Sequence, residues 1–522
     1  MNNNYKALLA TLQSHGDDSN PRILREKTQT VSDERILKYM QPVRLENAPR
    51  WPIDMKIKAT SVVASPEKSR IKAYNLSDLH VDADKNMDWV CSACVRDPED
   101  ADVFTVFIVP GDVGSDVERI RAVFESLVRQ YDAVIYVPGN HEAWCLGKEA
   151  LRTKSTDSVQ KIAEVVSVAQ ACGVYTGPLR ISTFSSHRAL CIFPLYGWYH
   201  AGWDIEPDVA HPTWEAVEKA LPFSTKWSDF SMCHWPIDLV QRSEWVSTAV
   251  GPDVPDNTVL AELFAGLNEP FLRPLTDPCA TLQEAEAYFR THSTRAPLIQ
   301  PGDTVISFSH FIPRVELLPE KRFIMEPLLA RVVGSDALEA QVQRLKPHLH
   351  LFGHSHIPID LCLQGIQYVQ WPVGYFREAT EQCAVVRATG PLLCYDSELG
   401  TGPTGIPALA SKDASWSYYY RNYEREPHVV GPLAPWAMQR LRQFDRAMQL
   451  PEAPPVVPPP SNLFSAVISH TASPGTATDS QNVSQNGPVP LYSPPAGLPV
   501  SPPVLKFRGA STAPNPSHNG LL

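Results

Sequence analysis

The regular part of the chain begins with short apolar runs separated by polar turns. Runs of this kind, typical of strands that are buried on both faces, lie at 71–76, 104–109, 134–137 and 190–195. The apolar residues of 116–131 instead recur every three or four positions, which predicts an amphipathic helix, and 158–171 has the same period. Strands that alternate with helices in this way predict an α/β protein built on layered sheets.

The same kind of pattern returns after residue 300. Further strands are predicted at 303–309, 349–352, 366–370 and 383–387. A helix is predicted at 335–345, capped by Ser335 or Asp336. The segment 198–300 between the two halves is a long insertion, and 198–245 holds six of the twelve tryptophans. It is either an irregular insertion whose aromatic side chains anchor loops or a cap that shapes a site.

Composition divides the chain into four segments. Residues 1–65 form an N-terminal extension, in which 32–39 predicts a short helix, and residues 66–400 form the core domain. Residues 401–450 are a C-terminal extension. Prolines dominate from 451 to 522, with Ser, Thr, Asn and Gly between them. Because this composition cannot bury a core, we expect a disordered Pro-rich C-terminal tail.

Charge and composition narrow the partners of the protein. The net charge of −11 argues against nucleic acid as a partner, since phosphate backbones bind basic faces. No run of about 18 apolar residues is present, so no membrane span is predicted. The start of the chain lacks the features of a secretory signal. Ten cysteines without a framework suit free thiols in a reducing compartment, and we therefore expect a cytoplasmic protein.

Five of the predicted strands end in a cluster of polar residues that can bind metals. The clusters are Asp78-x-His80, Gly111-Asp112, Gly139-Asn140-His141, His310 and Gly353-His354-x-His356. Parallel strands bring such ends to one edge of a sheet. Two aspartates, one asparagine and several histidines, without a thiolate, suit metals of borderline hardness such as Mn, Fe or Zn.

The arrangement is suited to two metal ions. Asp112 has two carboxylate oxygens and can bridge two ions, and the two histidines of His354-x-His356 can serve one ion each. Two metals about 3.5–4 Å apart would clamp a phosphate and generate hydroxide from a bridging water.

Taken together and in this order, the five clusters resemble the motifs of the calcineurin-like metallophosphoesterases. The resemblance spans residues 71–390. It implies two mixed β-sheets packed as a sandwich and flanked by helices, with a dimetal site at their shared edge. It implies a first metal bound by Asp78, His80, Asp112 and His356. It implies a second metal bound by Asp112 as the bridge, Asn140, His310 and His354. His141 would then be the acid or the transition-state stabiliser near the leaving oxygen.

At two positions the sequence departs from the motifs of particular branches of this superfamily, which narrows the resemblance to the remaining members. The run Gly111-Asp-Val-Gly-Ser-Asp-Val117 lacks the arginine that Ser/Thr protein phosphatases of this superfamily carry soon after the bridging aspartate. Ser115 stands where purple acid phosphatases have a tyrosine ligand. The remaining group acts on small-molecule or nucleotide phosphoesters, and we expect a phosphomonoester or a phosphodiester of this kind as the substrate.

Other residues are candidates for substrate contacts. Arg314 lies four residues beyond His310 and could hold a phosphate by bidentate hydrogen bonds, or form a structural ion pair. His200 follows a predicted strand and could approach the site, or pack inside the insertion. The segment Gly374-Tyr-Phe-Arg-Glu378 is a candidate for the rim of the site.

The main alternative function is a catalytically inactive scaffold of the same fold. Its Pro-rich tail would recruit protein partners through polyproline segments. Every ligand position carries a residue that can bind a metal ion, which favours the enzyme over the scaffold. A nuclease of the same superfamily is disfavoured by the acidic charge and the lack of a basic stripe.

Overall fold

The structure is a computed structural model, and it describes most of the predicted core. The described residues are 36, 51–145, 155–184, 188–220, 222–240, 245–248, 251–276, 299–300, 302–324, 326–380, 382–399, 414–435 and 437–438. The tail predicted to be disordered, 451–522, lies outside them. So does the helix predicted at 32–39, apart from the helical and buried Ile36.

The smaller of two main sheets has the strand order β13-β2-β3-β4. Its strands are β2 (Arg70–Asn75), β3 (Val103–Pro110), β4 (Ala133–Val137) and β13 (Leu392–Asp396). Strands β2, β3 and β4 are parallel, and β13 pairs with β2 in the antiparallel direction. The sheet is therefore mixed, with three parallel strands that end at the same edge.

The larger sheet has the order β1-β5-β6-β9-β10-β12-β11. Its strands are β1 (Thr60–Val63), β5 (Leu179–Ser182), β6 (Leu190–Pro194), β9 (Thr304–Phe308), β10 (Leu349–Phe352), β11 (Ile359–Leu363) and β12 (Ile366–Gln370). Strands β6, β9, β10 and β12 run parallel, whereas β5 with β6 and β11 with β12 are antiparallel pairs. This sheet is mixed as well.

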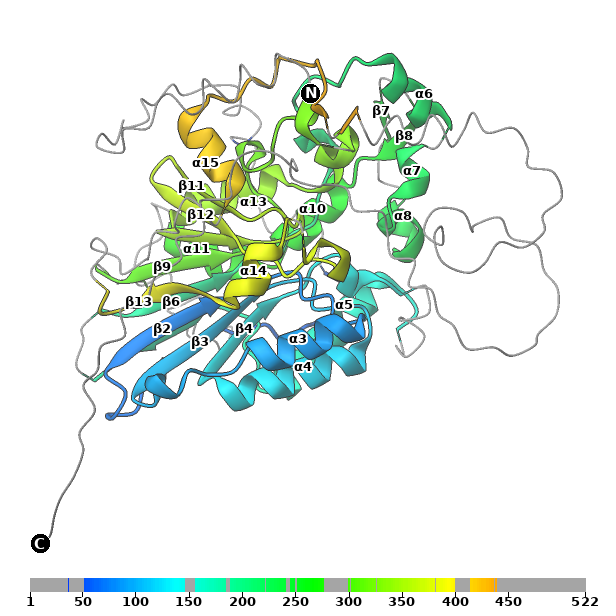
Figure 1. Cartoon of the computed structure of the whole chain (residues 1–522). Helices are drawn as coiled ribbons and strands as arrows, with labels where there is room; N and C mark the ends of the chain where they lie inside the picture. The colour runs from blue at the N-terminus through cyan, green and yellow to red at the C-terminus, as the bar shows by residue number, and fades with distance from the viewer. Residues whose placement is uncertain are drawn as a thin grey trace, which may run out of the picture. The chain divides into compact units, whose positions relative to one another are not determined.

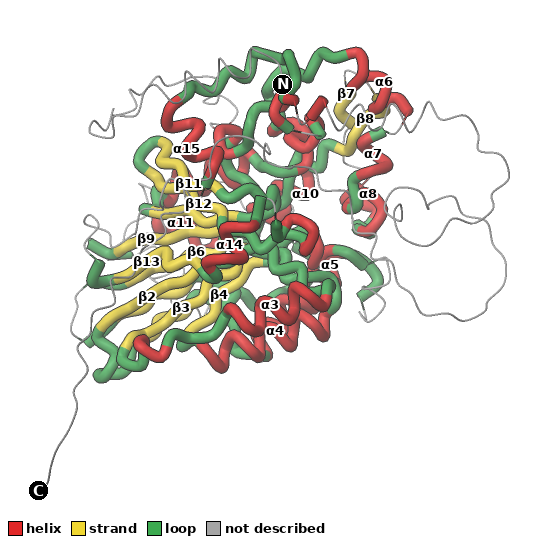
Figure 2. Tube along the Cα trace, viewed as in Figure 1, coloured by secondary structure: helices red, strands yellow, loops and turns green. Residues whose placement is uncertain are grey.

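The two sheets pack face to face, and helices cover their outer faces (Figures 1 and 2). Strand β3 shows why, because its side chains alternate between two apolar clusters. Val106 and Ile108 pack between the sheets, whereas Phe107 and Val109 pack under the helices. A strand that is apolar on both faces needs a cover on each side. The predicted sandwich of two mixed sheets flanked by helices is confirmed.

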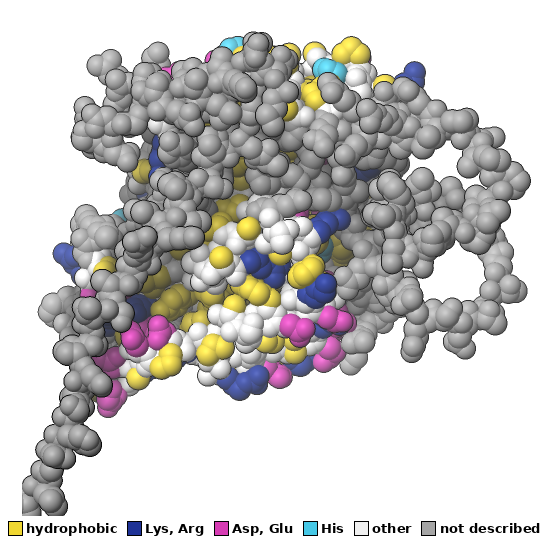
Figure 3. All heavy atoms as spheres, in the orientation of Figure 1, with side chains coloured by type: hydrophobic (Ala, Val, Ile, Leu, Met, Phe, Trp, Pro, Cys, Tyr) yellow, Lys and Arg dark blue, Asp and Glu magenta, His cyan; other side chains and the backbone are white. Residues whose placement is uncertain are grey.

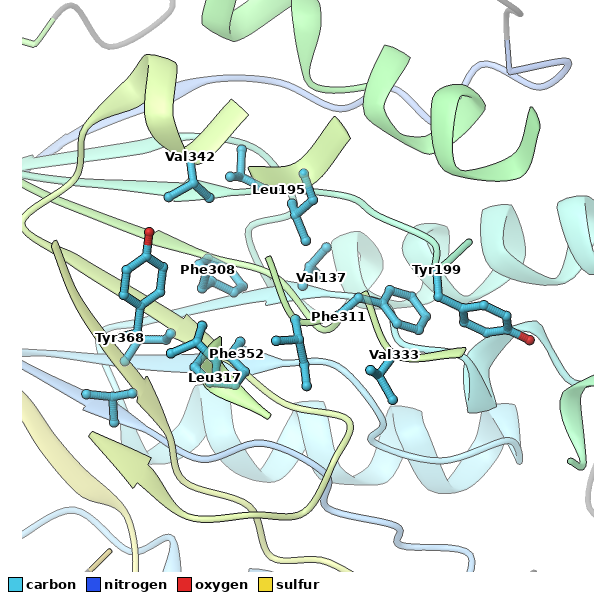
Figure 4. Packing of buried hydrophobic residues seen from close by; sticks show 14 of the residues in the cluster. Val137, Leu195, Tyr199, Phe308, Phe311, Leu317, Val333, Val342, Phe352 and Tyr368 are labelled. Atoms are coloured by element: carbon cyan, nitrogen blue, oxygen red, sulfur yellow. The ribbon is translucent and has the colours of Figure 1, made fainter. Parts of the chain in front are cut away.

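The core between the layers is continuous. Figure 4 shows Val137 of β4 close to Phe308 of β9 and Phe352 of β10, with Leu195 and Val342 beyond them. All these side chains are fully buried. The strand ends that carry the polar clusters are therefore anchored in one dense apolar body, which limits how far they can move.

The helices match the sequence prediction where the apolar period is clear. Helix α4 (Val117–Gln130) is capped by Asp116, which accepts from the backbone N–H groups of Glu118 and Arg119. Helix α13 (Asp336–Leu345) is capped by Ser335. Outside the insertion, the described residues also form α3 (Asp84–Ala93), α5 (Ser158–Ala171), α14 (Ala384–Thr389) and α15 (Ser415–Asn422). Short 3₁₀ helices lie at Pro98–Asp100, His141–Ala143, Ala201–Trp203, Val315–Leu317, Lys321–Phe323, Pro327–Val332 and Phe376–Glu378.

The insertion contains more regular structure than an irregular segment would. Its elements are α6 (Pro212–Ala220), α7 (Phe223–Lys226), α8 (Asp229–Met232), α9 (Ile237–Val240), β7 (Trp245–Thr248), β8 (Gly251–Pro255), α10 (Thr258–Gly266) and α11 (Glu269–Thr276). Buried and partly buried ion pairs join it to the core domain. Lys321 Nζ lies 2.6 Å from Asp204 Oδ2 and 2.9 Å from Asp208 Oδ1.

One predicted strand is wrong. Residues 383–387 are largely helical and belong to α14. The apolar run there misled the prediction, because Cys383 and Val386 are buried while Ala384 is exposed. A spacing of three between buried positions is the period of a helix. Strands β1, β5, β11 and β13 were not predicted, and β1 lies inside the predicted extension 1–65.

The exposed faces of α3 and α4 carry charged side chains of both signs. Figure 3 shows acidic and basic side chains close together along the edge where α3 and α4 lie. One ion pair there joins the two helices, with Arg119 Nη2 2.6 Å from Asp84 Oδ1. Among the described residues, no helix has the length and apolar character to cross a membrane.

Phe124 should contribute strongly to stability, because its ring is fully buried between α4 and the smaller sheet, 4.9 Å from the ring of Tyr136. We expect Phe124→Ala to lower the free energy of unfolding by about 3–5 kcal/mol. Phe184, 72% exposed, is the matched control, and Phe184→Ala should change it by less than about 0.5 kcal/mol. Urea unfolding measures both. Equal effects of the two variants would contradict the described packing.

Candidate metal centre

The five polar clusters meet at one edge of the sandwich. Strands β2, β3 and β4 end there in the smaller sheet, and β9 and β10 end there in the larger one. Hydrogen bonds join the loops that follow. The backbone N–H of Asp78 donates to the carbonyl of Gly111 at 3.1 Å, and that of His354 donates to Asp78 Oδ1 at 2.8 Å. The second bond links the two sheets directly.

Several of these residues have an unusual backbone. Asp78, His80, Asp112, His354 and His356 have φ angles of 55°, 45°, 51°, 77° and 56°. This left-handed region is costly for residues with a Cβ, at about 1–3 kcal/mol each. Such conformations persist only where the surrounding structure imposes them. Here the anchored strand ends turn the backbone so that the five side chains converge.

Two glycines make room for the carboxylates. A Cβ on Gly139 would lie 2.2 Å from Asp112 Oδ1, and a Cβ on Gly353 would lie 2.8 Å from Asp78 Oδ2. Only glycine allows the backbone to approach these oxygens so closely. The glycines in the Gly139-Asn-His and Gly353-His-x-His motifs therefore have a steric role in the site.

The first group of candidate ligands consists of Asp78, His80, Asp112 and His356. All four are buried, and each offers one ligand atom within 4.8 Å of the others. The Nε2 atoms of His80 and His356 are 2.9 Å apart, and His356 Nε2 lies 3.5 Å from Asp78 Oδ1. These are the residues that the resemblance implied for the first metal.

The second group consists of Asp112, His310 and His354, again buried and within 4.8 Å of one another. The side-chain oxygen of Asn140 completes it, at 3.0 Å from His310 Nε2 and 2.9 Å from His354 Nδ1. The two nitrogens are 3.0 Å apart. Asp112 belongs to both groups, with Oδ1 3.4 Å from His310 Nε2 and Oδ2 3.9 Å from His80 Nε2.

The protons of the second group point away from its centre. His310 Nδ1 donates to the carbonyl of Pro110 at 3.0 Å, and His354 Nε2 donates to the carbonyl of Val332 at 2.9 Å. Carbonyl oxygens only accept, so the inner nitrogens of these neutral rings carry lone pairs. The amide nitrogen of Asn140 donates outward to Asp229. Three acceptors therefore face one another, an arrangement that a cation stabilises.

Burial keeps three of the four histidines neutral, the form that binds metals. It lowers the pKa of His80 and His310 well below the ordinary value, and that of His354 to about 3. For His356 burial also lowers the pKa, but the Glu378 carboxylate outweighs it and the net pKa is raised. Glu378 Oε2 accepts from His356 Nδ1 at 2.8 Å. Carboxylate partners of this kind orient a metal-ligating imidazole.

The two candidate carboxylate ligands show the opposite shift. Burial raises the pKa of Asp112 well above the ordinary value and also raises that of Asp78. A buried cation reverses such shifts, since it stabilises the ionised form. The buried Asp/His cluster could therefore hold metal ions, and its donor chemistry fits them.

His141 lies beside the groups but in neither of them. Its ring stacks on that of Trp144, with centroids 3.7 Å apart. Its Nε2 lies 3.1 Å from the hydroxyl of Tyr375 and 3.8 Å from Asp112 Oδ2. Burial lowers the pKa of His141 well below the ordinary value, so the ring is neutral in the protein alone. It borders the cavity at the candidate metal centre.

Sequence reasoning missed several residues of the site. The cavity is lined by ligand residues of both groups and by Trp144, Trp227, Ser228, Asp229, Tyr375 and Glu378. Tyr375 and Glu378 come from the segment suggested as a rim. Trp227, Ser228 and Asp229 belong to the insertion, which supports the interpretation of this segment as part of the site. Asp229 gave no signal in the sequence, because nothing relates it to Asn140 before the chain folds.

Glu142 holds the loops behind the ligands. It is fully buried and accepts from the backbone N–H groups of Gly139 at 2.7 Å and Val113 at 2.6 Å. Burial raises its pKa to about 7, although these bonds act in the opposite direction. Its carboxylate joins the loops after β3 and β4, and so fixes Asp112 relative to Asn140.

The structure does not bring the two predicted substrate residues to the cavity. Arg314 is buried and pairs with Glu316 at 2.6 Å and Glu339 at 3.2 Å. His200 is buried, with Nε2 3.4 Å from Asp336 Oδ2. Neither lines the cavity. These contacts fit the structural alternatives, an ion pair for Arg314 and a packed insertion histidine for His200.

Comparisons with known proteins add little to this geometry. No family model matches the chain, and no curated protein matches it. The chain is similar to the phosphopantetheinyl hydrolase PptH from Mycobacterium tuberculosis at 17% identity, covering 65% of this chain and 99% of the other, with a TM-score of 0.36. It is also similar to a cold-active protein-tyrosine phosphatase from a Shewanella species at 12% identity, covering 56% and 76%, with a TM-score of 0.21. Likenesses this slight carry no argument about the site.

Gly139 provides a steric test of the centre. In Gly139→Ala the new Cβ would displace the Asp112 carboxylate, so we expect the protein to lose at least one bound metal while it still folds. Gly197→Ala is the control, since its Cβ would meet only ordinary contacts, the nearest 3.5 Å away. Metal content by mass spectrometry and thermal unfolding check both variants. Full metal content in Gly139→Ala would contradict the close approach.

Proposed function

We propose that this protein is a metal-dependent phosphoester hydrolase of the calcineurin-like metallophosphoesterase type, with two metal ions of the Mn, Fe or Zn kind. One observation carries the proposal. Two buried groups of ligand atoms share the Asp112 carboxylate, and the acceptors of the second group face one another with their protons directed outward. Two such groups around one carboxylate fit a pair of ions better than a single ion.

When bound, a pair of divalent ions neutralises phosphoryl charge and lowers the pKa of bound water toward 7. Asp78, His80 and His356 would hold one ion, Asn140, His310 and His354 the other, and Asp112 both. The chain itself supplies orientation. Glu378, Pro110 and Val332 fix three of the four imidazoles, those of His356, His310 and His354, through their outer nitrogens. The ligands are thus aimed before any metal or substrate arrives.

His141 is the group of the chain placed to act on the substrate. It borders the cavity, its ring is held by Trp144, and neither ligand group needs it. Its Nε2 is 3.8 Å from Asp112 Oδ2, beyond hydrogen-bond reach, so the imidazole does not orient that ligand, to which the backbone N–H of His141 donates instead. We place His141 as the donor of a proton or hydrogen bond to the leaving oxygen, with the Tyr375 hydroxyl beside it.

The proposed substrate is a small-molecule or nucleotide phosphomonoester or phosphodiester. Trp144, Trp227 and Tyr375 line the cavity and offer partly buried aromatic surface to the ester group. Flat parts of a substrate, such as a nucleobase, pack well on aromatic surfaces of this kind.

Asp112→Asn tests the proposed function. An amide cannot supply two anionic oxygens, so we expect the variant to bind less metal and to lose phosphoester hydrolysis. The wild-type protein is first assayed with Mn²⁺, Zn²⁺ and Fe²⁺ against aryl mono- and diesters, because without its activity the comparison has no reference. Asp208→Asn is the control, because Asp208 pairs with Lys321 and not with a residue of either ligand group. Hydrolysis by Asp112→Asn at the wild-type rate, or none by the metal-loaded wild type, would rule out the proposal.

His141→Ala tests the donor role. We expect both metals to remain and kcat to fall by about 10²–10⁴-fold, the usual contribution of a positioned proton donor. The loss should be larger for alkyl alcohols, which need a proton to leave, than for nitrophenol. Metal analysis and a leaving-group series check this. Depleted metal with an equal loss for every leaving group would show instead that His141 supports a ligand.

A further inference from the structure

Asp229 is a buried carboxylate of the insertion that reaches into the metal centre. It lies at the first position of α8 and is 4% exposed. The insertion is otherwise separate in sequence from the five motifs, and Asp229 stands 89 residues beyond Asn140. No motif of the sequence includes it, so its place in the site is a product of the fold.

Each oxygen of this carboxylate accepts from a site residue. Oδ1 accepts from the amide nitrogen of Asn140 at 2.9 Å and from Trp144 Nε1 at 2.7 Å. Oδ2 accepts from Trp227 Nε1 at 2.9 Å. Charged acceptors form the stronger hydrogen bonds, so the three donors are held firmly.

The bond to Asn140 decides which way its amide faces. A carboxylate accepts but does not donate, so the NH₂ group of Asn140 must point toward Asp229. The carbonyl oxygen of the same amide then points to the opposite side, at 3.0 Å from His310 and 2.9 Å from His354. With the amide reversed, NH₂ would face the metal position and could not serve as a ligand.

The same carboxylate also positions aromatic surface at the cavity. The Trp144 ring, fixed through Nε1, stacks on His141 at 3.7 Å. The Trp227 ring, fixed to the other oxygen, lies edge to face with His354 at 5.9 Å. Asp229 thus connects a metal ligand, the candidate proton donor and the cavity wall through a single group.

We propose that Asp229 is a positioning residue for metal binding, through which the insertion orients Asn140 toward the second group of ligands. The inference rests on the proposed function in one respect, that this group binds a metal ion. The competing explanation is that Asp229 only anchors the insertion, as Asp208 does through Lys321 and Arg331. That explanation predicts lower stability but unchanged affinity for metal.

The test is titration calorimetry of Mn²⁺ into the metal-free full-length protein. Wild type should bind two ions. Asp229→Asn loses the charge that strengthens these bonds, and one of its two acceptors becomes an NH₂ group, so it holds the Asn140 amide and the two indoles less firmly. We expect it to weaken one of the two ions by about 10–100-fold, the usual cost of losing the partner of a ligand. Asp208→Asn, the matched carboxylate-to-amide control at an anchor of the insertion, should bind both ions as wild type does.

An exchange variant separates orientation from anchoring. Asn140→Asp combined with Asp229→Asn restores a hydrogen bond between the two positions, with the donor and acceptor reversed, and leaves an oxygen of residue 140 for the metal. We expect it to bind two ions more tightly than Asp229→Asn does. Because it keeps this bond, it also serves as the test if Asp229→Asn alone does not fold. The Asn140→Asp single variant is the reference for the added charge of the new ligand, and the exchange variant should also bind the ions more tightly than this single variant, in which two carboxylates face each other. An anchor role predicts no gain when Asp229→Asn is added to Asn140→Asp.

The outcomes are decisive for each proposal separately. Wild-type affinity for both ions in Asp229→Asn, or no recovery in the exchange variant, would overturn the positioning role. A wild-type protein that binds two ions but hydrolyses no phosphoester would overturn the proposed function and leave the affinity comparison valid. A wild-type protein that binds no Mn²⁺, Zn²⁺ or Fe²⁺ would overturn both.

Discussion

A single buried carboxylate, that of Asp112, is the constraint on which the site depends. It belongs to both groups of ligand atoms, and it comes from the loop after β3, the central parallel strand of the smaller sheet. Burying it is unfavourable, as its raised pKa shows. The backbone N–H of His141 compensates in part by donating to Oδ1 at 3.0 Å. A bound cation is the larger compensation that the geometry allows.

The sandwich sustains this unfavourable arrangement. Five candidate ligands have left-handed backbones. Each such backbone costs about 1–3 kcal/mol, so the five together cost several times as much. At Gly139 and Gly353 the backbone lies so close to the carboxylates of Asp112 and Asp78 that a Cβ would overlap them. The two apolar clusters on either side of β3 hold the strand ends in place and so impose these conformations. Stability stored in the core is therefore used to organise the centre, which is where proteins commonly accept local strain.

Groups outside the ligand set decide how the ligands act. Backbone carbonyls of Pro110 and Val332 take the outer protons of His310 and His354, and Glu378 takes that of His356. Asp229 does the same for the amide of Asn140. These four acceptors come from different parts of the chain, including the insertion and the segment after β12. The insertion is therefore part of the centre as well as its cover.

The sequence by itself determined the elements with a clear period and the residues directly after them. A short apolar run that precedes a glycine or a polar turn fits few structures other than a strand. This made it possible to predict the strands that precede Asp78, Asp112, Asn140, His310 and His354. Their meeting at one edge followed from the parallel direction of the strands. The run 383–387 was not predictable in the same way, since its apolar residues fit a strand or a helix until burial selects Cys383 and Val386.

Only the tertiary structure decided which residues surround the ligands. Arg314 and His200 follow strand ends as plausibly as the ligands do, yet nearby carboxylates hold them away from the cavity. Asp229 reaches the centre from a segment without any motif, and Glu378 comes from a segment for which the sequence suggested only a place at the rim. The physical reason is that a hydrogen-bond partner needs only to be near in space. Local sequence encodes the conformation of a turn, whereas packing of distant segments determines which acceptor stands beside it.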